Sequence, residues 1–118
     1  MDLNTAHQAH SEWKIKLRLA ITKKEQLDAD TIGKDNCCAF GKWLHGEAAS
    51  QYGRLPGYKD CLGKHAAFHK EAASVARSIN AGQYEKAEAM LGAGTPYALA
   101  SNAVGSAILG LKKAVVPA

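Results

Sequence analysis

The sequence predicts an all-α protein, a four-helix bundle with additional short helices. The chain of 118 residues is rich in Ala, Leu, Lys and Glu and contains few strand-forming residues. Apolar residues recur at alternating three- and four-residue steps in three long stretches, which is the period of a helix that buries one face. Gly, Pro and capping residues separate these stretches. The length suits a single domain, residues 1–118, with a substantial core.

The first predicted helix starts near the N-terminus and gives way to a polar connection over residues 22–33. Asn4 or Thr5 is its expected N-cap. Its apolar stripe consists of Leu3, Ala6, His10, Trp13, Leu17 and Ala20. A single histidine in such a stripe, here His10, is most often a hydrogen-bonded core residue. His7, one turn earlier, is a weaker candidate for a ligand.

A short helix is predicted over residues 36–44, with Asp35 as its N-cap. This places Cys37 and Cys38 in the first turn. The partial positive charge of a helix N-terminus lowers a cysteine pKa and favours the thiolate. Gly41, inside the helix, indicates close approach by another helix. A purely structural role for two adjacent buried cysteines is the alternative at this point.

A further turn over residues 47–52 precedes a long helix, which has Pro56 in its first turn and ends at residues 80–82. Its apolar stripe is Tyr58, Leu62, His65, His69, Ala72, Ala76 and Ile79. Residues four positions apart lie on one face of a helix, so His65 and His69 can reach one metal ion. Burial of two imidazoles without partners is costly, which favours such a site. Cys61, one turn earlier, is a reserve ligand.

Two more helices are predicted beyond this point. A short one covers residues 83–91, and a longer one opens with Thr95 as N-cap and Pro96 in the first helical position. The stripe of this last helix is Tyr97, Ala100, Val104, Ile108, Leu111 and Val115. With it the bundle has about four helices and short additional turns.

Composition argues against several classes of protein. The net charge of +4 is modest and gathers near helix ends, so we expect solvated basic faces and no nucleic-acid binding. No signal-peptide pattern opens the sequence, and no apolar run is long enough to span a bilayer. The three cysteines suit a reducing cytoplasm, where free thiols more often serve metals or redox chemistry than disulfides.

The residues with metal-binding chemistry form an ordered series with aromatic and glycine neighbours: His10 and Trp13, then Cys38, Phe40, Gly41 and Trp43, then His65 and His69. This series resembles the chemoreceptor zinc-binding domain (CZB) family. The family pattern is His-x-x-aromatic, then Cys-x-hydrophobic-Gly-x-hydrophobic, then His-x-x-x-His. Every part of the pattern has a counterpart here at a compatible spacing, and chance agreement of all the parts is rare.

The resemblance implies one Zn²⁺ per chain, with four ligands: His10, Cys38, His65 and His69. Zinc takes thiolate and imidazole ligands in tetrahedral geometry. Cys37 is either a resolving thiol for an oxidised Cys38 or a packing residue, and packing is the preferred interpretation. Four protein ligands leave no position for substrate, so we do not expect an enzyme. The site is expected to be walled by Trp13, Phe40, Trp43 and Phe68.

The resemblance also implies a sensory role. Members of the family are dimeric and regulate bacterial chemoreceptors or diguanylate cyclases, in response to zinc availability or to oxidants such as hypochlorous acid. We expect Cys38 to leave the metal under these conditions and the freed helix to move. Ile15 and Leu19 lie off the main stripe and are expected dimer contacts, unless they pack on a neighbouring helix. No output domain is recognised in the sequence, so the chain is expected to be a stand-alone member or an excised sensory domain.

A second interpretation comes from a different class of protein. The same ligands would also suit a structural zinc-stapled helical bundle that acts as a protein-interaction module. Substitution of Cys38 separates the two interpretations, because a sensor keeps its fold and changes its signal, whereas a structural site loses stability.

Overall fold

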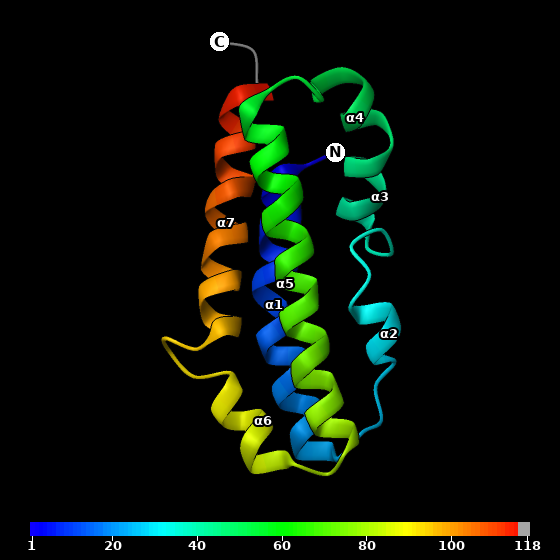
Figure 1. Ribbon diagram of the computed structural model, residues 1–118, viewed down its shortest axis with the longest axis vertical. Helices are drawn as coiled ribbons and strands as arrows, with labels where there is room; N and C mark the ends of the chain where they lie inside the picture. Colours follow the sequence, from blue (N-terminus) through cyan, green and yellow to red (C-terminus); the bar gives the residue numbers. More distant parts are fainter. Residues whose placement is uncertain (116–118) are drawn as a thin grey trace.

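The computed structural model describes residues 1–115, and every regular element within them is a helix. Three long helices, α1 (Leu3–Lys23), α5 (Pro56–Asn80) and α7 (Pro96–Val115), form the body of the molecule. α1 and α5 run in the same direction and α7 runs opposite to both (Figure 1). The all-α prediction is confirmed. None of the described helices is long and apolar enough to cross a membrane.

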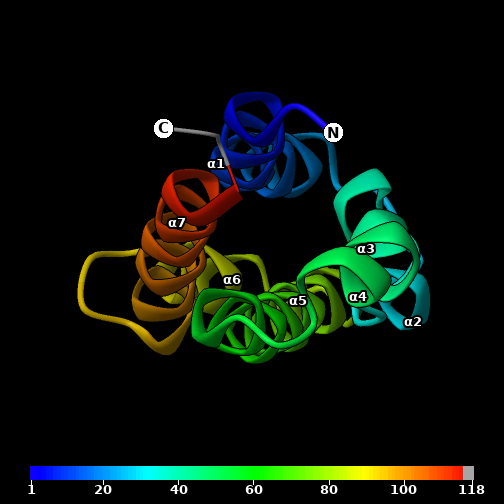
Figure 2. The ribbon, with the colours of Figure 1, turned by 90° about the horizontal axis from the view of Figure 1, so that it is seen from above.

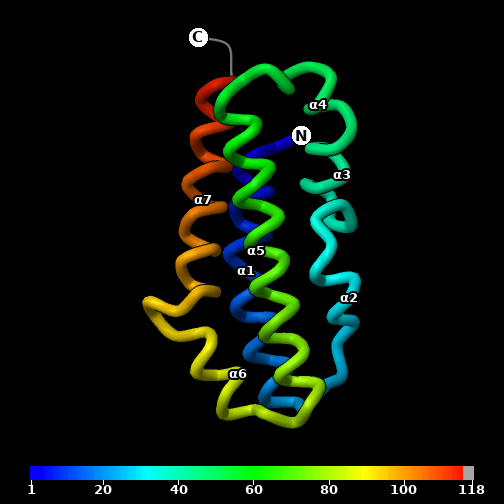
Figure 3. The backbone as a smooth tube through the Cα atoms, viewed as in Figure 1, coloured from blue at the N-terminus to red at the C-terminus, as the bar shows by residue number. Residues whose placement is uncertain are grey.

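Short helices build the remaining side of the molecule. α2 (Ala29–Ile32), α3 (Ala39–His45) and α4 (Glu47–Tyr52) follow one another along the length of α5, as the backbone trace in Figure 3 shows. Figure 2 shows α1, α7, α5 and this column of short helices arranged around a common centre. α6 (Tyr84–Met90) lies in the connection between α5 and α7. The molecule is elongated, with extents of 47 × 25 × 19 Å.

The start of α1 differs from the prediction by two to three residues. The N-cap is Asp2, whose carboxylate accepts hydrogen bonds from the backbone N–H groups of Asn4 at 2.9 Å and Thr5 at 3.3 Å. The expected cap at Asn4 or Thr5 is therefore wrong, because both residues lie inside the first turn and supply donors rather than the acceptor. Except for Trp13, which is half-buried, the predicted apolar stripe of α1 is buried.

The cysteine segment also differs from the prediction. α3 begins at Ala39 and its N-cap is Cys38, whose Sγ accepts a hydrogen bond from the Gly41 N–H at 3.2 Å. Asp35 is not the cap, because its carboxylate pairs with Nε2 of His45 at 2.9 Å. Cys37 consequently lies in the loop before the helix, and not in its first turn.

The later elements follow the sequence prediction closely. α4, the long α5 from Pro56 and the final helix from Pro96 begin where proline, glycine and capping residues place them. Thr95 Oγ1 accepts a hydrogen bond from the Ala98 N–H at 3.2 Å, as expected of an N-cap. The last residue of α5, Asn80, fixes the connection between α1 and α2. Its side-chain oxygen accepts a hydrogen bond from the N–H of Leu27 at 2.7 Å, and its side-chain nitrogen donates one to the carbonyl of Leu27 at 2.8 Å.

The core lies between α1, α5, α7 and the column of short helices. Its largest fully buried apolar side chains are Phe68, Leu17, Leu44, Ile79, Leu91, Ile108 and Leu111. The closest backbone packing joins α5 to α7, α1 to α7 and α2 to α5, whereas α3 packs mainly on α4. The backbone of α3 is thus the part of the short-helix column that the rest of the bundle holds least closely.

Two apolar side chains on α1 face solvent. Ile15 is 61% exposed and Leu19 is 50% exposed. The interpretation that they pack on a neighbouring helix of the same chain is therefore wrong. Their role as dimer contacts stays a prediction.

Gly41 supplies a test of the local packing. A Cβ atom there would overlap the backbone carbonyl of Asp35 and lie 3.1 Å from Cε1 of His65. The close approach predicted from this glycine is real, but its partners are a loop and one imidazole. We expect Gly41→Ala to lower the free energy of unfolding by about 1–3 kcal/mol, since the backbone has to move.

The matched control is Gly63→Ala in α5, where an added Cβ meets nothing within 4 Å. That substitution should stabilise the chain by about 0.5–1 kcal/mol, because alanine is the better helix former. Chemical denaturation of both variants measures the difference. Equal stability of the two variants would contradict the packing described at Gly41.

Candidate metal centre

Four side chains from three parts of the chain converge inside the bundle. They are His10 from α1, Cys38 at the N-cap of α3, and His65 and His69 from consecutive turns of α5. One ligand atom of each lies within 4.8 Å of those of the others. His10, His65 and His69 are buried and Cys38 is half-buried. The structure therefore brings together all four residues that the sequence singled out.

The distances suit a single tetrahedral ion. Sγ of Cys38 lies 3.3 Å from Nε2 of His65 and 3.6 Å from Nε2 of His69, and the two Nε2 atoms are 3.0 Å apart. Tetrahedral zinc, with bonds of about 2.0–2.3 Å, holds its ligand atoms roughly 3.3–3.7 Å from one another. All four ligand atoms lie within 4.8 Å of one another, so a bound ion would have to draw them somewhat closer together.

Backbone carbonyls orient two of the imidazoles. Nδ1 of His10 lies 2.8 Å from the carbonyl oxygen of Ala6, and Nδ1 of His69 lies 2.8 Å from that of Ile32. A carbonyl only accepts, so each Nδ1 carries the proton and each Nε2 offers a lone pair to the centre. Nε2 of His10 is buried and has no hydrogen-bond partner in the protein. A metal ion at the centre would satisfy this unpaired lone pair.

His65 is held in a different way. Its Nε2 faces the other ligand atoms, while its Nδ1 is buried without a partner. The ring stands edge-on to Phe40, with 5.1 Å between the ring centroids. Packing, rather than a hydrogen bond to a carbonyl, therefore sets the orientation of this imidazole.

Burial keeps the three imidazoles neutral. Loss of hydration lowers the pKa of His10, His65 and His69, and lowers the pKa of His65 to about 3. A neutral imidazole is the form that binds a metal. The site is thus prepared for a cation at neutral pH without having to release protons from histidine.

The pKa of the Cys38 thiol is raised, whereas the position at a helix N-terminus predicted a lowered pKa. Burial raises its pKa, and hydrogen bonds from the backbone N–H groups of Gly41 and Phe40 offset only part of this effect. Desolvation outweighs the helix terminus because the sulfur faces the interior of the bundle. A bound cation would supply the missing stabilisation of the thiolate.

Aromatic rings enclose the centre on several sides. The ring of His10 contacts Phe40 and Phe68 edge-on, with centroids 5.6 and 5.3 Å away, and Trp13 lies 6.4 Å from His69. The predicted wall is confirmed for these three rings. Trp43 is set further back, since it stacks on Phe40 at 5.9 Å.

Three other residues considered from the sequence lie outside the group of four ligand atoms. The imidazole of His7 lies against Gly105 of α7, where an added Cβ would be 3.2 Å from Nε2. Cys61 is fully buried, and burial raises its pKa to about 12. Cys37 is exposed, so the preferred interpretation that it is a packing residue is wrong.

One cavity reaches the centre from the short-helix side. We call it the loop cavity; its volume is about 270 Å³ and it is lined by Trp13, Asp28, Thr31, Ile32, Lys34, Cys37, Cys38 and His69. Of the four converging residues, only Cys38 and His69 line it. A solute that enters the loop cavity therefore meets the sulfur side of the centre.

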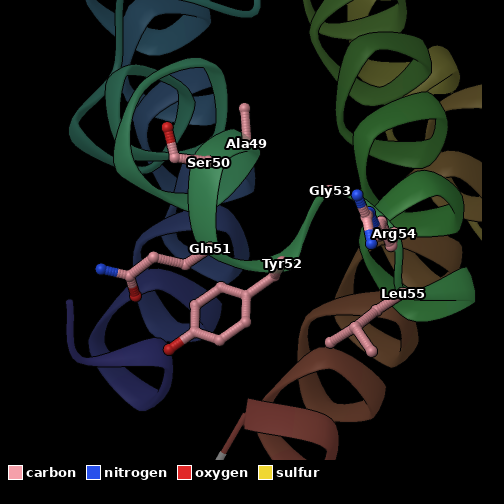
Figure 4. Close-up of a pocket in the computed structure, with 7 residues that line it drawn as sticks. All are labelled: Ala49, Ser50, Gln51, Tyr52, Gly53, Arg54 and Leu55. Atoms are coloured by element: carbon pink, nitrogen blue, oxygen red, sulfur yellow. The ribbon is translucent and has the colours of Figure 1, made fainter.

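A second cavity, of about 580 Å³, lies at the connection from α4 to α5 (Figure 4). Residues 49–55 line it, and none of them is a histidine, cysteine or carboxylate. It therefore offers no set of metal ligands.

Sequence reasoning missed the two carbonyls that orient His10 and His69. A backbone oxygen leaves no mark on a sequence, and Ile32 is 37 residues away from His69. Ala6 had a weak signal, because a helical side chain can reach the carbonyl four residues before it.

Comparison with known proteins agrees with the geometry. The family model described as the chemoreceptor zinc-binding domain matches residues 10–76, a span that contains all four converging residues. Comparisons with curated proteins and with solved structures find no match. The matched model and the cluster of three histidines and one cysteine support one Zn²⁺ per chain as the cofactor. The chain belongs to the chemoreceptor zinc-binding domain family, whose members are regulatory rather than catalytic.

Proposed function

We propose that this chain is a zinc-dependent sensory domain in which His10, Cys38, His65 and His69 hold the ion. The observation that carries the proposal is the convergence of these four donors from α1, α3 and α5 on one buried point. Zinc bound there would complete the pairing of Nε2 of His10 and stabilise the Cys38 thiolate.

Each residue has a distinct part in the proposed response. His10 and His69 are preoriented by backbone carbonyls, and His65 is fixed by packing. Cys38 is the one anionic ligand and the one that is half-buried. It is therefore the ligand that an oxidant reaches, and its oxidation or the loss of zinc would release the start of α3.

The packing of α3 supports movement of this helix as the output. α1 and α5 both pack on α7, whereas α3 packs mainly on α4. Buried Phe40 and Leu44 and the hydrogen bond from Tyr58 to the Leu44 carbonyl hold the body of α3 to the long helices. A tie through Cys38 would therefore act mainly on the start of α3. We therefore propose that the signal is a shift at the start of α3, where the loop meets the helix, rather than release of the whole helix.

The partners and the compartment are part of the same proposal. Because the family regulates signalling proteins, the helix movement would pass to a chemoreceptor or a diguanylate cyclase. We also propose that residues 1–118 form one domain, a view that the packing of α7 on α1 and α5 supports. A reducing cytoplasm suits its three free cysteines.

Metal content tests the ligand assignment. The purified chain should carry about one zinc per chain by mass spectrometry, and Cys38→Ala and His69→Ala should each lose it or bind it far more weakly. His7→Ala is the matched control, since this histidine is half-buried on α1 but lies outside the cluster. Full zinc content in Cys38→Ala, or its loss in His7→Ala, would refute the assignment.

Hydrogen exchange after zinc removal distinguishes a sensory domain from a structural zinc site. We expect chelation to increase hydrogen exchange in α3 and α4, while α5 and α7 remain protected, because the latter pair packs closely without the metal site. The thermal midpoint should fall as bound zinc no longer favours the folded state. Loss of protection across all the long helices at once would instead support the structural zinc-stapled module.

The exposed face of α1 supports a homodimer as the proposed assembly. Glutamate at either Ile15 or Leu19 should convert a dimer to a monomer in sedimentation experiments, because burial of an unpaired charge in an apolar interface is costly. Leu99→Glu is the control, as this leucine of α7 is 61% exposed, like Ile15. An unchanged dimer in both α1 variants would show that the interface lies elsewhere.

A further inference from the structure

Two cysteines line the loop cavity. Cys37 and Cys38 both line it, Cys37 is exposed, and Cys38 is half-buried with its sulfur toward the histidines. The third thiol, Cys61, is fully buried in α5 and does not line this cavity. If Cys38 is oxidised by a solute in the loop cavity, Cys37 is therefore the thiol in the same space.

We propose that Cys37 is a resolving thiol, and that oxidation of Cys38 ends in a reversible disulfide between these adjacent residues. The proposal rests on the redox response proposed above and adds a modification site to it. Cys37 has no part in the cluster of four ligand atoms, so it is free to react while the other ligands stay in place.

The chemistry needs a two-electron oxidant, for which hydrogen peroxide serves as the probe. The peroxide transfers one oxygen atom to the Cys38 thiolate, which becomes a sulfenic acid, and the remainder leaves as hydroxide. The sulfur of Cys37 then loses its proton and bonds to the sulfur of Cys38. The S–O bond of the sulfenic acid breaks, and the hydroxide and the proton leave as water.

The position of the two residues in the chain suits this reaction. Residues 34–38 belong to no helix, and α3 starts only at Ala39, so the loop can adjust without unwinding a helix. Consecutive Cα atoms are about 3.8 Å apart, which is shorter than the roughly 4.4–6.8 Å that ordinary disulfides span. A disulfide between neighbours is therefore strained and easily reduced, as a reversible switch requires.

The disulfide has two consequences for the domain. A disulfide sulfur carries no negative charge, so the centre loses its anionic ligand for as long as the bond lasts. The bond also keeps Cys38 from further oxidation to the sulfinic and sulfonic acids, which reductants do not reverse. Cys37 would thus turn a destructive oxidation into a recoverable one.

The experiment treats the zinc-loaded full chain with one equivalent of hydrogen peroxide. Zinc release is followed with a chromogenic chelator. The product is then alkylated under denaturing conditions, and the mass of the intact chain is measured by mass spectrometry. In the wild-type chain we expect a mass lower by two hydrogen atoms, apart from the added alkyl group, and alkylation at Cys61 alone. Addition of dithiothreitol should restore both thiols and zinc binding.

Two variants complete the test. Cys37→Ser should still release zinc, but its mass should rise by one or more oxygen atoms, and with excess peroxide most of its recoverable zinc binding should be lost. Cys61→Ala is the control and should behave as the wild-type chain does. Peptide mapping then locates the disulfide.

The outcomes separate this inference from the redox role on which it rests. If peroxide releases no zinc from the wild-type chain, the redox role itself fails. If zinc leaves while Cys37 remains open to alkylation, the redox role stands and the resolving role of Cys37 is wrong. A disulfide to Cys61, or one that links two chains, would also overturn the assignment.

Discussion

Burial of three neutral imidazoles and one thiol around a single point is the constraint on which the rest of the structure depends. These groups satisfy one another only in part, since Nε2 of His10 and Nδ1 of His65 are buried without a hydrogen-bond partner. The carbonyls at Nδ1 of His10 and His69 leave both Nε2 atoms as acceptors, and Nε2 of His10 has no donor at all. One cation accepts all four lone pairs at once, so it removes a cost that packing alone leaves in place.

The four ligands lie on elements that pack differently in the bundle. α1 and α5 both pack on α7, and the carbonyl of Ile32 that orients His69 belongs to α2, which itself packs on α5. The backbone of α3 approaches the long helices less closely, and buried Phe40 and Leu44 connect it to them instead. Three ligands thus lie on the long helices and one at the junction of a loop with a short helix, which is the asymmetry on which the proposed sensor depends.

Helical spacing made most of this architecture predictable. The i and i+4 histidines, the apolar stripes, and the start signals at Pro56 and Pro96 depend on local geometry, and they located the long helices and the pair His65 and His69. His10 and Cys38 were assigned as ligands only through the resemblance to the family pattern. The caps at Asp2 and Cys38 were misassigned because several neighbouring side chains can accept from a helix N-terminus, and only the folded chain decides which one does. The position of Cys37 depends on the path of a loop, which carries no periodic signal.

The sulfur of Cys38 explains how a chemical change at the centre can reach the backbone directly. The same atom faces the histidines and accepts the hydrogen bond of the Gly41 N–H that caps α3. Oxidation of this sulfur would therefore disturb the proposed metal site and the first turn of the helix in one step. Because Gly41 also packs against the Asp35 carbonyl and the ring of His65, the disturbance begins where the loop, α3 and α5 meet. No separate relay between site and helix is required.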